Sequence, residues 1–501
     1  MSYLLALGLG AAYSLGFAPF DYWVCTAIAI GGLFWLLHRD NLRPALLAWC
    51  FGLGKYGLGV SWVYVSIHVY GNAPVLLAGA LTALFIAVLA AAFCAPVGWL
   101  YGWLRPHTTW NVTDVALFAA AWVLMDWVST WLFTGFPWLL PGYAFMNTPL
   151  LAMAPVVGVL GAGLVVVFIT GGLTVMLASR RVQIRMVLVT VLPLLLAFGL
   201  AQVQWVKPVG SYTVALVQGN IDQNLKWTAA DALPNVRKHL DLSADHWDAD
   251  LLLWPEAAVT LYPQQAQGLL DDLHEKGRLS QTNIVLGIPG IEKIPNGGYR
   301  FQNLAIGLGA ASGRFAKHHL VPFGEFVPFE DLLRGLIEFF NLPMSSFTPG
   351  LRLQPNLKLS FGEAAMAICY EIAYPESMRQ SAKTAALLMT ISNDTWFGAS
   401  IGPLQHMQIA RMRAVENGRW LLRATNNGVT AIVDPRGHVT AALAQFEAGV
   451  LRGQISVVEG RTPYSYGGHW PVLTVLLLIL GGLAGRVGLH SLHKRGSFFS
   501  P

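Results

Sequence analysis

The chain has 501 residues, of which 54% are hydrophobic and only 12% carry a formal charge. Soluble domains carry roughly 25% charged residues, so this composition excludes a wholly soluble protein and predicts that much of the chain lies in lipid. A net charge of +5 would suit a nucleic-acid partner. No basic patch with interleaved aromatic residues occurs in the sequence, however, so we expect no nucleic acid to bind.

The charged residues are distributed unevenly along the chain. Residues 1–207 contain no glutamate, residues 208–465 have the composition of an ordinary soluble domain, and residues 471–490 are apolar again. This pattern predicts a transmembrane bundle of about seven helices over 1–207 and a soluble domain over 208–465. A closing transmembrane helix and a short tail are expected over 466–501.

Eight apolar stretches approach the ~20 residues that a membrane-crossing helix needs. We expect these spans near residues 3–19, 22–37, 44–65, 74–104, 114–134, 151–177, 186–206 and 471–490. A signal peptide is the alternative interpretation of the first stretch. That stretch lacks a basic n-region and a clear small-residue cleavage site, so we expect a retained helix.

Basic residues mark alternate loops of the predicted bundle. They are Arg39, Arg43, Arg105, Arg180, Arg181 and Arg185, with Arg486, Lys494 and Arg495 near the end of the chain. The loops near 66–73 and 135–150 contain no lysine or arginine. Because cytoplasmic loops are rich in these residues, we expect both termini in the cytoplasm and the soluble domain on the far side, which in a bacterium is the periplasm.

Two ionisable residues, Lys55 and Asp126, lie inside predicted spans. Charged side chains within membrane helices are functional candidates by default. The alternatives are a structural pair or a lysine that reaches toward the interface. We favour a structural role for both residues.

The soluble domain alternates apolar strands with helical patterns. Strands are predicted over 212–220, 251–254, 283–287, 364–368, 386–390 and 429–433, and helices over 230–245, 264–277 and 403–417. Strands this apolar belong to sheets that helices cover. The fold class expected for this part of the chain is therefore α/β.

Cys369 stands apart from the other cysteines. Cys25, Cys50 and Cys94 fall in apolar stretches, whereas Cys369 is alone in the soluble domain. On the oxidising side of a membrane it has no cysteine to pair with, so a structural disulfide is excluded. It is either a small buried hydrophobe on a strand or a nucleophile.

Three reactive side chains lie at or near strand ends, where α/β active sites are usually built: Glu256, Lys317 and Cys369. A thiol is only a few per cent ionised at neutral pH, and a buried carboxylate can serve as its base. A lysine ammonium with a backbone N–H can hold an oxyanion. Taken singly, each could be a surface carboxylate, a surface lysine or a core thiol, but together they suffice for acyl transfer.

The order of these residues resembles that of the carbon–nitrogen hydrolase (nitrilase) superfamily. The matching stretches are 254–256, 317–328, 369–371 and 392–397 in the soluble domain, and 61–66 and 135–138 in the bundle. With eight predicted spans, the whole chain closely resembles the bacterial apolipoprotein N-acyltransferases. The resemblance implies an α-helical membrane bundle joined to a nitrilase-like αββα sandwich.

The resemblance also implies roles for particular residues. Cys369 is the nucleophile that takes the acyl chain as a thioester, Glu256 is the general base, and Lys317 stabilises the tetrahedral oxyanion. Glu325 supports this triad. The other residues expected to support the site or to bind substrate are Tyr370, Glu371, Trp227, Pro328, Gly135 and Trp138.

The substrates implied by the resemblance are both lipids. The acyl donor is a phospholipid, and the acceptor is the α-amino group of the diacylglyceryl-cysteine that begins an immature apolipoprotein. A thioester intermediate suits two substrates that use one pocket in turn. The resemblance further implies a monomer in the bacterial inner membrane.

Neither a cofactor nor a metal is expected. His318 and His319 are adjacent on an extended segment and point opposite ways, and no spaced Cys or Asp partners appear.

Two strongly apolar segments of the soluble domain, 326–329 and 336–344, are candidates for arms at the membrane interface that gate lipid entry. Ordinary core packing is the alternative. Deletion of 339–344 is expected to reduce lipid turnover and to spare folding.

Two other functions are compatible with parts of the sequence. A membrane-tethered amide hydrolase would use the same triad with water as the second substrate, but eight spans exceed what an anchor requires. A transporter or lipid-binding protein with a dead enzyme domain would have a degraded triad and broken, repeated helices, neither of which we find.

Overall fold

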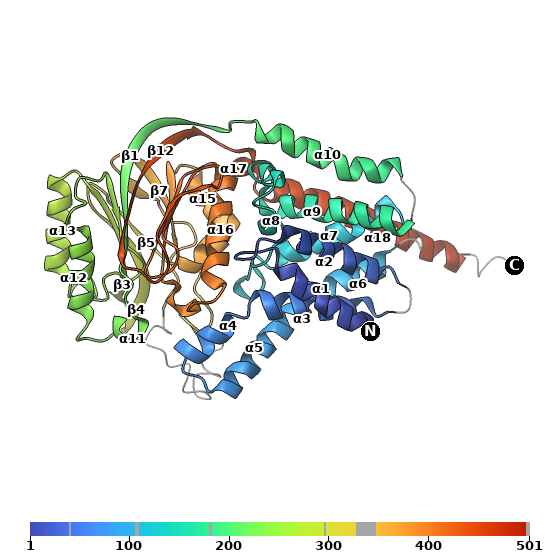
Figure 1. The fold of residues 1–501 in the computed structure, drawn as a ribbon, viewed down its shortest axis with the longest axis horizontal. Helices are drawn as coiled ribbons and strands as arrows, with labels where there is room; N and C mark the ends of the chain where they lie inside the picture. Colours follow the sequence, from blue (N-terminus) through green and yellow to red (C-terminus); the bar gives the residue numbers. More distant parts are fainter. Residues whose placement is uncertain (40–41, 106–109, 180–182, 295–296, 327–346, 497–501) are drawn as a thin grey trace. The chain divides into compact units, whose positions relative to one another are not determined.

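A computed structural model describes residues 1–39, 42–105, 110–179, 183–294, 297–326 and 347–496, with side chains up to residue 486. The chain forms two compact units (Figure 1). A helical unit comprises Met1–Val63, Leu76–Val203 and Gly467–Pro501. An α/β unit comprises Tyr64–Val75 and Gln204–Tyr466. Residues 64–75, which are far from the α/β unit in sequence, therefore belong to it in space.

Apolar helices make up the helical unit. They are α1 (Ser2–Ser14), α2 (Trp23–Leu37), α3 (Pro44–Gly59), α5 (Val75–Leu89), α6 (Ala95–Leu104), α7 (Val112–Val128), α8 (Pro141–Ala144), α9 (Ala154–Ser179), α10 (Ile184–Ala201) and α18 (Trp470–Gly496). The short α4 (Val63–Val65) marks the point where the chain passes from the helical unit to residues 64–75 of the α/β unit, and a π-helical turn, Ala90–Cys94, joins α5 to α6. Each predicted span overlaps at least one of these helices, although residues 15–19, 60–62, 129–134 and 202–206 lie outside them.

Three helical segments among the described residues are long and apolar enough to cross a membrane: Val75–Leu104, Pro149–Ser179 and Ile184–Ala201. Shorter apolar helices cover Ser2–Ser14, Trp23–Leu37 and Trp470–Arg486. Large apolar side chains on α10 are exposed, including Leu188, Leu192 and Phe198. Soluble proteins rarely expose so continuous an apolar surface to water, so α10 agrees with a membrane protein.

Glycines bring α1 and α3 into close contact. A Cβ on Gly10 would lie 1.9 Å from the carbonyl oxygen of Phe51, and a Cβ on Gly54 would lie 1.9 Å from that of Leu7. Small residues that let helix backbones approach are the usual means of packing in membranes, where the lipid supplies no hydrophobic driving force between helices.

Lys55 lies inside the helical unit rather than at its edge. Its side chain is buried, and Nζ lies 5.0 Å from the ring centroid of Tyr13, 5.2 Å from that of Tyr56 and 5.7 Å from that of Trp122. Asp126 lines the same small cavity as Lys55. Aromatic faces attract a cation in this arrangement, so the structure supports a packing role for Lys55 and not a lysine that reaches the interface.

Two six-stranded sheets form the described part of the α/β unit. The first has the order β12 (Gly449–Gly460), β1 (Val206–Gln218), β2 (Leu251–Leu253), β3 (Asn283–Lys293), β4 (Tyr299–Gly309) and β5 (Arg314–Ala316). The second has the order β11 (Val439–Ala442), β10 (Ala431–Val433), β9 (Leu421–Thr425), β8 (Leu387–Ser392), β7 (Gly362–Ile368) and β6 (Leu357–Leu359). Parallel pairs at the centre of each sheet bring several strand ends to one edge.

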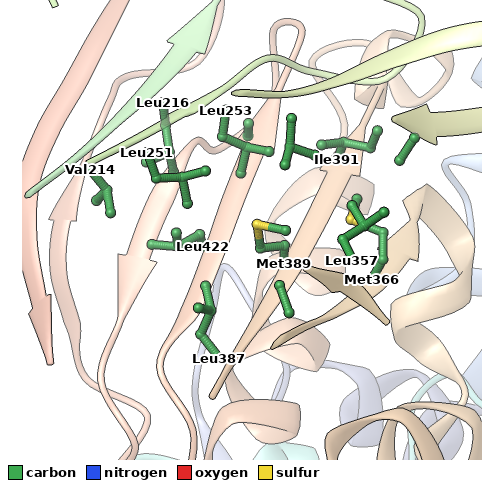
Figure 2. Close-up of a cluster of buried hydrophobic side chains, with 14 of the residues drawn as sticks. Val214, Leu216, Leu251, Leu253, Leu357, Met366, Leu387, Met389, Ile391 and Leu422 are labelled. Atoms are coloured by element: carbon green, nitrogen blue, oxygen red, sulfur yellow. The ribbon is translucent and has the colours of Figure 1, made fainter. Parts of the chain in front are cut away.

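Side chains alternate between the two faces of these strands, as strand geometry requires. Leu251 and Leu253 face the second sheet and pack with its Met389 and Leu422 in the core between the sheets (Figure 2). The intervening Leu252 points to the opposite face. Both faces of each sheet are thus apolar, and this explains why these strands are nearly continuous hydrophobic runs in the sequence.

Helices cover the two outer faces. The first sheet packs against α12 (Ala232–Ser243) and α13 (Gln267–Leu279), and the second against α15 (Pro375–Ala382) and α16 (Gly402–Asn417) (Figure 1). Two short α-helices, α11 (Gln223–Lys226) and α17 (Pro463–Gly467), lie after β1 and after β12. The predicted α/β fold with helix-covered sheets is confirmed.

Candidate active site

Glu256 lies just beyond the carboxyl end of β2. The pairing of β2 with β3 extends by one more hydrogen bond, from the Trp254 N–H to the Val285 carbonyl oxygen. The chain then turns at Ala257, which has a positive φ of 47°. The carboxylate is buried and accepts two short hydrogen bonds. Asn303 Nδ2 donates to Oε1 at 2.7 Å, and the backbone N–H of Asn393 donates to Oε2 at 2.7 Å. These bonds fix the orientation of the carboxylate.

Lys317 follows β5 and is held by its backbone. Its backbone N–H donates to the backbone carbonyl of Asn303 at 2.8 Å, and its own carbonyl accepts from the Gly350 N–H at 2.8 Å. The buried ammonium donates to Glu325 Oε1 at 2.8 Å and to Glu256 Oε1 at 3.4 Å. Burial alone would lower the pKa of Lys317, but the two carboxylates outweigh it and raise the pKa, so the ammonium stays charged.

Cys369 is the first residue after β7 and begins a 3₁₀ helix, Cys369–Ala373. Its φ of 55° is uncommon for a non-glycine residue and is typical of strained functional positions. The thiol is nearly buried, and the nearby Ser392 acts to lower its pKa. Burial, followed by the charge of Glu256, raises the pKa of Cys369 to about 12, while Lys317 lowers it. The thiol is therefore protonated at rest and needs a base to react.

Glu371 ties the cysteine segment to the lysine segment. Its Oε2 accepts from the backbone N–H of Ile368 at 2.9 Å, and Oε1 accepts from the N–H groups of His318 and His319 at 2.7 and 3.1 Å. Burial raises the pKa of Glu371 to about 7, against the opposing effect of these three donors. The contacts indicate a structural link between the two loops that carry Lys317 and Cys369.

A buried polar network supports the backbone of Cys369. His406 Nε2 donates to the Cys369 carbonyl at 3.1 Å, and Arg423 Nη2 lies 3.1 Å from His406 Nδ1. Asp394 accepts from Arg423 at 2.6 Å and from Ser392 at 2.6 Å. Burial and the Arg423 charge lower the pKa of His406, against the opposing effect of Asp394, whose Oδ1 lies 3.1 Å from His406 Nδ1.

Several of these residues were not predicted from the sequence. Asn303 lies on β4, a strand that we did not predict, and His406 lies on a helix that is buried on nearly every side. Lys226, also buried, donates from Nζ to the Glu256 carbonyl at 3.0 Å. Asp394 was noted only as part of a matching stretch. Lys226 gives no sequence signal of burial, because lysine is almost never fully buried in proteins.

The remaining candidates are placed as follows. Trp227 follows α11 and is half-buried, and its indole Nε1 is buried with no hydrogen-bond partner in the described part of the chain. Tyr370 is buried edge-on against Tyr374, with ring centroids 5.3 Å apart. Pro328 and most of the two predicted arms, 326–329 and 336–344, lie outside the described residues.

Gly135 and Trp138 belong to the helical unit. Gly135 has a φ of 93° and follows two residues with positive φ. Trp138 is buried against Trp62 and Phe136, with ring centroids 5.4 and 5.7 Å away. Their part in substrate binding stays a prediction.

The adjacent histidines each have a separate partner. His318 Nδ1 bonds the Gly350 carbonyl at 2.8 Å, and His319 Nε2 bonds the Ser377 hydroxyl at 2.9 Å. His319 also stacks on Tyr374 with ring centroids 3.8 Å apart. These contacts give both side chains a structural role in the loop before Glu325.

The cluster combines a thiol, a carboxylate that can take its proton, and a fixed ammonium that can neutralise an oxyanion. Glu256, Lys317 and Glu325 are in direct contact, and Cys369 lies close enough to Glu256 and Lys317 for both charges to act on its pKa. This combination can attack a carbonyl carbon and hold the acyl group as a thioester.

Two families match different parts of the chain. The carbon-nitrogen hydrolase family matches residues 213–462, and the apolipoprotein N-acyltransferase N-terminal domain matches residues 9–172. The first match contains the whole cluster of charged residues and the thiol, and the second covers much of the helical unit together with residues 64–75 of the α/β unit.

Curated relatives match over nearly the full length. The apolipoprotein N-acyltransferase of Shewanella oneidensis is 42% identical over 501 residues, with 95% of each chain covered. That of Pseudomonas syringae pv. tomato is 41% identical with 97% of each chain covered, and that of Vibrio cholerae serotype O1 is 39% identical with 94% covered.

Solved structures align with about half of the chain. The C. elegans NitFhit protein is 16% identical, covers 54% of this chain and 65% of its own, and gives a TM-score of 0.39. Saccharomyces cerevisiae Nit3, a member of the nitrilase superfamily, is 19% identical, covers 54% of this chain and 97% of its own, and gives a TM-score of 0.37.

Proposed function

Because the chain belongs to the apolipoprotein N-acyltransferases, we propose that it transfers an acyl chain from a phospholipid to the α-amino group of a diacylglyceryl-cysteine through a thioester on Cys369. The observation that carries the mechanism is the contact of one ammonium, Lys317, with two buried carboxylates beside a buried thiol. Lipoprotein N-acylation itself follows from the family.

In the first half-reaction Glu256 takes the proton of the Cys369 thiol as Sγ attacks an ester carbonyl of the phospholipid. The C=O π pair moves to oxygen, and the Lys317 ammonium balances the resulting negative charge. The tetrahedral intermediate collapses by breaking the ester C–O bond. The proton on Glu256 passes to the departing alkoxide, which leaves as the alcohol of a lysophospholipid, and the acyl group stays on Cys369.

In the second half-reaction the neutral α-amino group of the acceptor attacks the thioester carbonyl. Glu256 accepts a proton from the amine, and the oxyanion again lies against Lys317. Breaking of the C–S bond releases the thiolate, which recovers a proton from Glu256. The product is an amide, and the enzyme returns to its starting state.

Other residues orient the reacting groups or are suited to bind substrate. Glu325 shares the Lys317 ammonium with Glu256 and accepts from the backbone N–H of Val321 at 2.9 Å. It therefore orients the lysine without competing for the thiol proton. Trp227, with its unpartnered indole N–H among the described residues, is suited to bind substrate as the half-reactions alternate.

The membrane arrangement is part of the proposal. Eight apolar segments cross a bacterial inner membrane, both termini lie in the cytoplasm, and residues 208–465 lie in the periplasm. Basic residues on alternate loops support this orientation. The protein acts as a monomer, and the segments 326–329 and 336–344 admit lipid to the site.

The thioester can be tested directly. Detergent-purified protein is incubated with acyl-labelled phospholipid and no acceptor, beside a Cys369→Ser variant. Label should bind the parent alone and be released by neutral hydroxylamine, because a thioester is cleaved under these conditions and an ester is not. A diacylglyceryl-peptide should then discharge the label into an amide.

Other outcomes are equally informative. No label on a protein that melts cooperatively would refute the acyl-transfer mechanism. Label that is lost to water at the same rate with and without the peptide would instead favour a membrane-tethered amide hydrolase.

A further inference from the structure

The charges of the catalytic cluster do not balance if only the predicted residues are counted. Lys317 supplies one positive charge, whereas Glu256 and Glu325 supply two negative charges. The other buried acids nearby have their own partners. Asp394 pairs with Arg423 at 2.6 Å, and Glu371 accepts three backbone N–H groups. One uncompensated carboxylate beside Cys369 would oppose formation of the thiolate.

A second buried lysine, Lys226, lies next to Glu256. Lys226 is 2% exposed, and its Nζ donates to the backbone carbonyl of Glu256 at 3.0 Å. The charges of Glu256 and Cys369 both act on it. Burying an ammonium is costly unless a charge partner repays it, and a single backbone carbonyl is a weak partner for one in this setting.

The other groups that face Lys226 do not replace this charge. His239 on α12 interacts with it, but burial lowers the pKa of His239 to about 4, so the imidazole is neutral. Asn235 on α12 donates only to the Lys226 carbonyl. Asp222, at the start of α11, is exposed. Glu256 and Cys369 are therefore the groups on which the Lys226 charge acts most directly.

We propose that Lys226 is a positioning residue of the active site, whose ammonium offsets the second carboxylate, favours the Cys369 thiolate and holds the Glu256 backbone. This role rests on the proposed function of Cys369 as the nucleophile. With Lys226 charged, two lysines face two glutamates and the cluster is neutral. Proton transfer from Cys369 to Glu256 then takes place without a net charge at the site.

The effect has a characteristic pH dependence. Burial lowers the pKa of Lys226 to about 8, against the opposing charges of Glu256 and Cys369. Below this pH the ammonium is present and favours the thiolate. Above it the amine is neutral, and the parent should behave like a protein that lacks the lysine.

The test is the alkylation rate of Cys369 by iodoacetamide from about pH 6 to pH 10, followed on the Cys369 peptide by mass spectrometry. The full-length parent is compared with Lys226→Met, Lys226→Arg and, as a matched control, Lys238→Met on α12. An opposite charge within a few ångströms shifts a pKa by about 1–3 units. The Lys226→Met protein should thus react at least about ten-fold more slowly at pH 7 and match the parent near pH 10.

The Arg variant keeps a charge that does not titrate in this range, so its alkylation profile should lack the bend near pH 8. The Lys238→Met control should follow the parent. A Met variant that reacts like the parent at all pH values, or that is slower by the same factor at all pH values, would overturn the proposal. The second result would assign Lys226 a purely structural role.

The readout needs no lipid, so it separates this inference from the proposed function. A parent that shows the predicted alkylation profile but forms no acyl-enzyme would refute acyl transfer and leave the role of Lys226 intact. If the parent forms acyl-enzyme but Lys226→Met has the same alkylation profile as the parent, acyl transfer would be supported and the role of Lys226 would be refuted.

Discussion

Gly287 on β3 offers a sharp test of how the fold positions Glu256, the proposed general base. A Cβ built on Gly287 would lie 2.6 Å from both the Pro255 oxygen and the Ala257 nitrogen, and 2.8 Å from Cα of Glu256. These are backbone atoms and cannot rotate away. A Gly287→Ala methyl would have to push the Glu256 segment by about 0.8 Å to reach ordinary van der Waals contact.

That displacement can be converted into a rate. Misplacement of a catalytic group by about 1 Å costs roughly 10²-fold in rate, so Gly287→Ala should slow acyl-enzyme formation about 30- to 100-fold. Overpacking should also lower stability by about 1–3 kcal/mol. The assay is single-turnover formation of the acyl-enzyme at saturating labelled phospholipid, with melting temperature measured on the same preparation.

Gly268→Ala is the matched control, because no atom lies within 4 Å of a Cβ at that position on α13. It should react at the parent rate and melt at the same temperature or slightly higher, since alanine is the better helix former by about 1 kcal/mol. If Gly287→Ala and Gly268→Ala gave equal acylation rates, Glu256 would not be the group whose position limits the reaction.

Three further predictions concern charges and contacts in the cluster. Lys317→Met leaves Glu256 and a second carboxylate buried side by side, so acyl-enzyme formation should fall at least about 10²-fold and the melting temperature should drop; an unchanged rate would contradict the oxyanion role. His406→Leu removes the donor to the Cys369 carbonyl and should slow acylation about ten-fold, whereas His406→Gln, whose amide can donate and accept at the same two places, should recover most of the rate; equal rates for the two variants would argue against a positioning role. Because burial lowers the pKa of Lys226 to about 8 from an ordinary 10.5, the unfolded chain binds more protons than the folded chain between these values, and the parent should gain stability relative to Lys226→Met as pH rises from 8 to 10.5. Urea titrations at both ends of that window check the sign, and a constant difference would refute it.

The local sequence pattern predicted those strands of the α/β unit whose side chains are buried on both faces of the sheet. The runs before Glu256 and Cys369 are apolar on both faces, so their ends could be located without knowing the partner strands. Other strands were missed for a physical reason. β12 carries glycines and charges, and its strand character comes from twelve antiparallel pairs with β1, which no local pattern reveals.

The candidate site divides in the same way. Glu256, Lys317 and Cys369 each lie beside an apolar run or within a specific motif and could be singled out from the chain alone. Lys226, Asn303 and His406 could not, because they lie in a short polar helix, inside an unpredicted strand and on a helix buried all round. Their partners are 30, 47 and 37 residues away in the chain.

The sequence by itself determined that the protein has an apolar helical part and an α/β part, and that a thiol, a carboxylate and a lysine follow apolar strands. Hydrophobic periodicity and composition are local properties, and they are sufficient for these conclusions. Only the tertiary structure decided which charges meet. The pKa of a buried thiol depends on every charge within several ångströms, and it is the packing of two sheets that brings Glu256, Lys317 and Lys226 to Cys369.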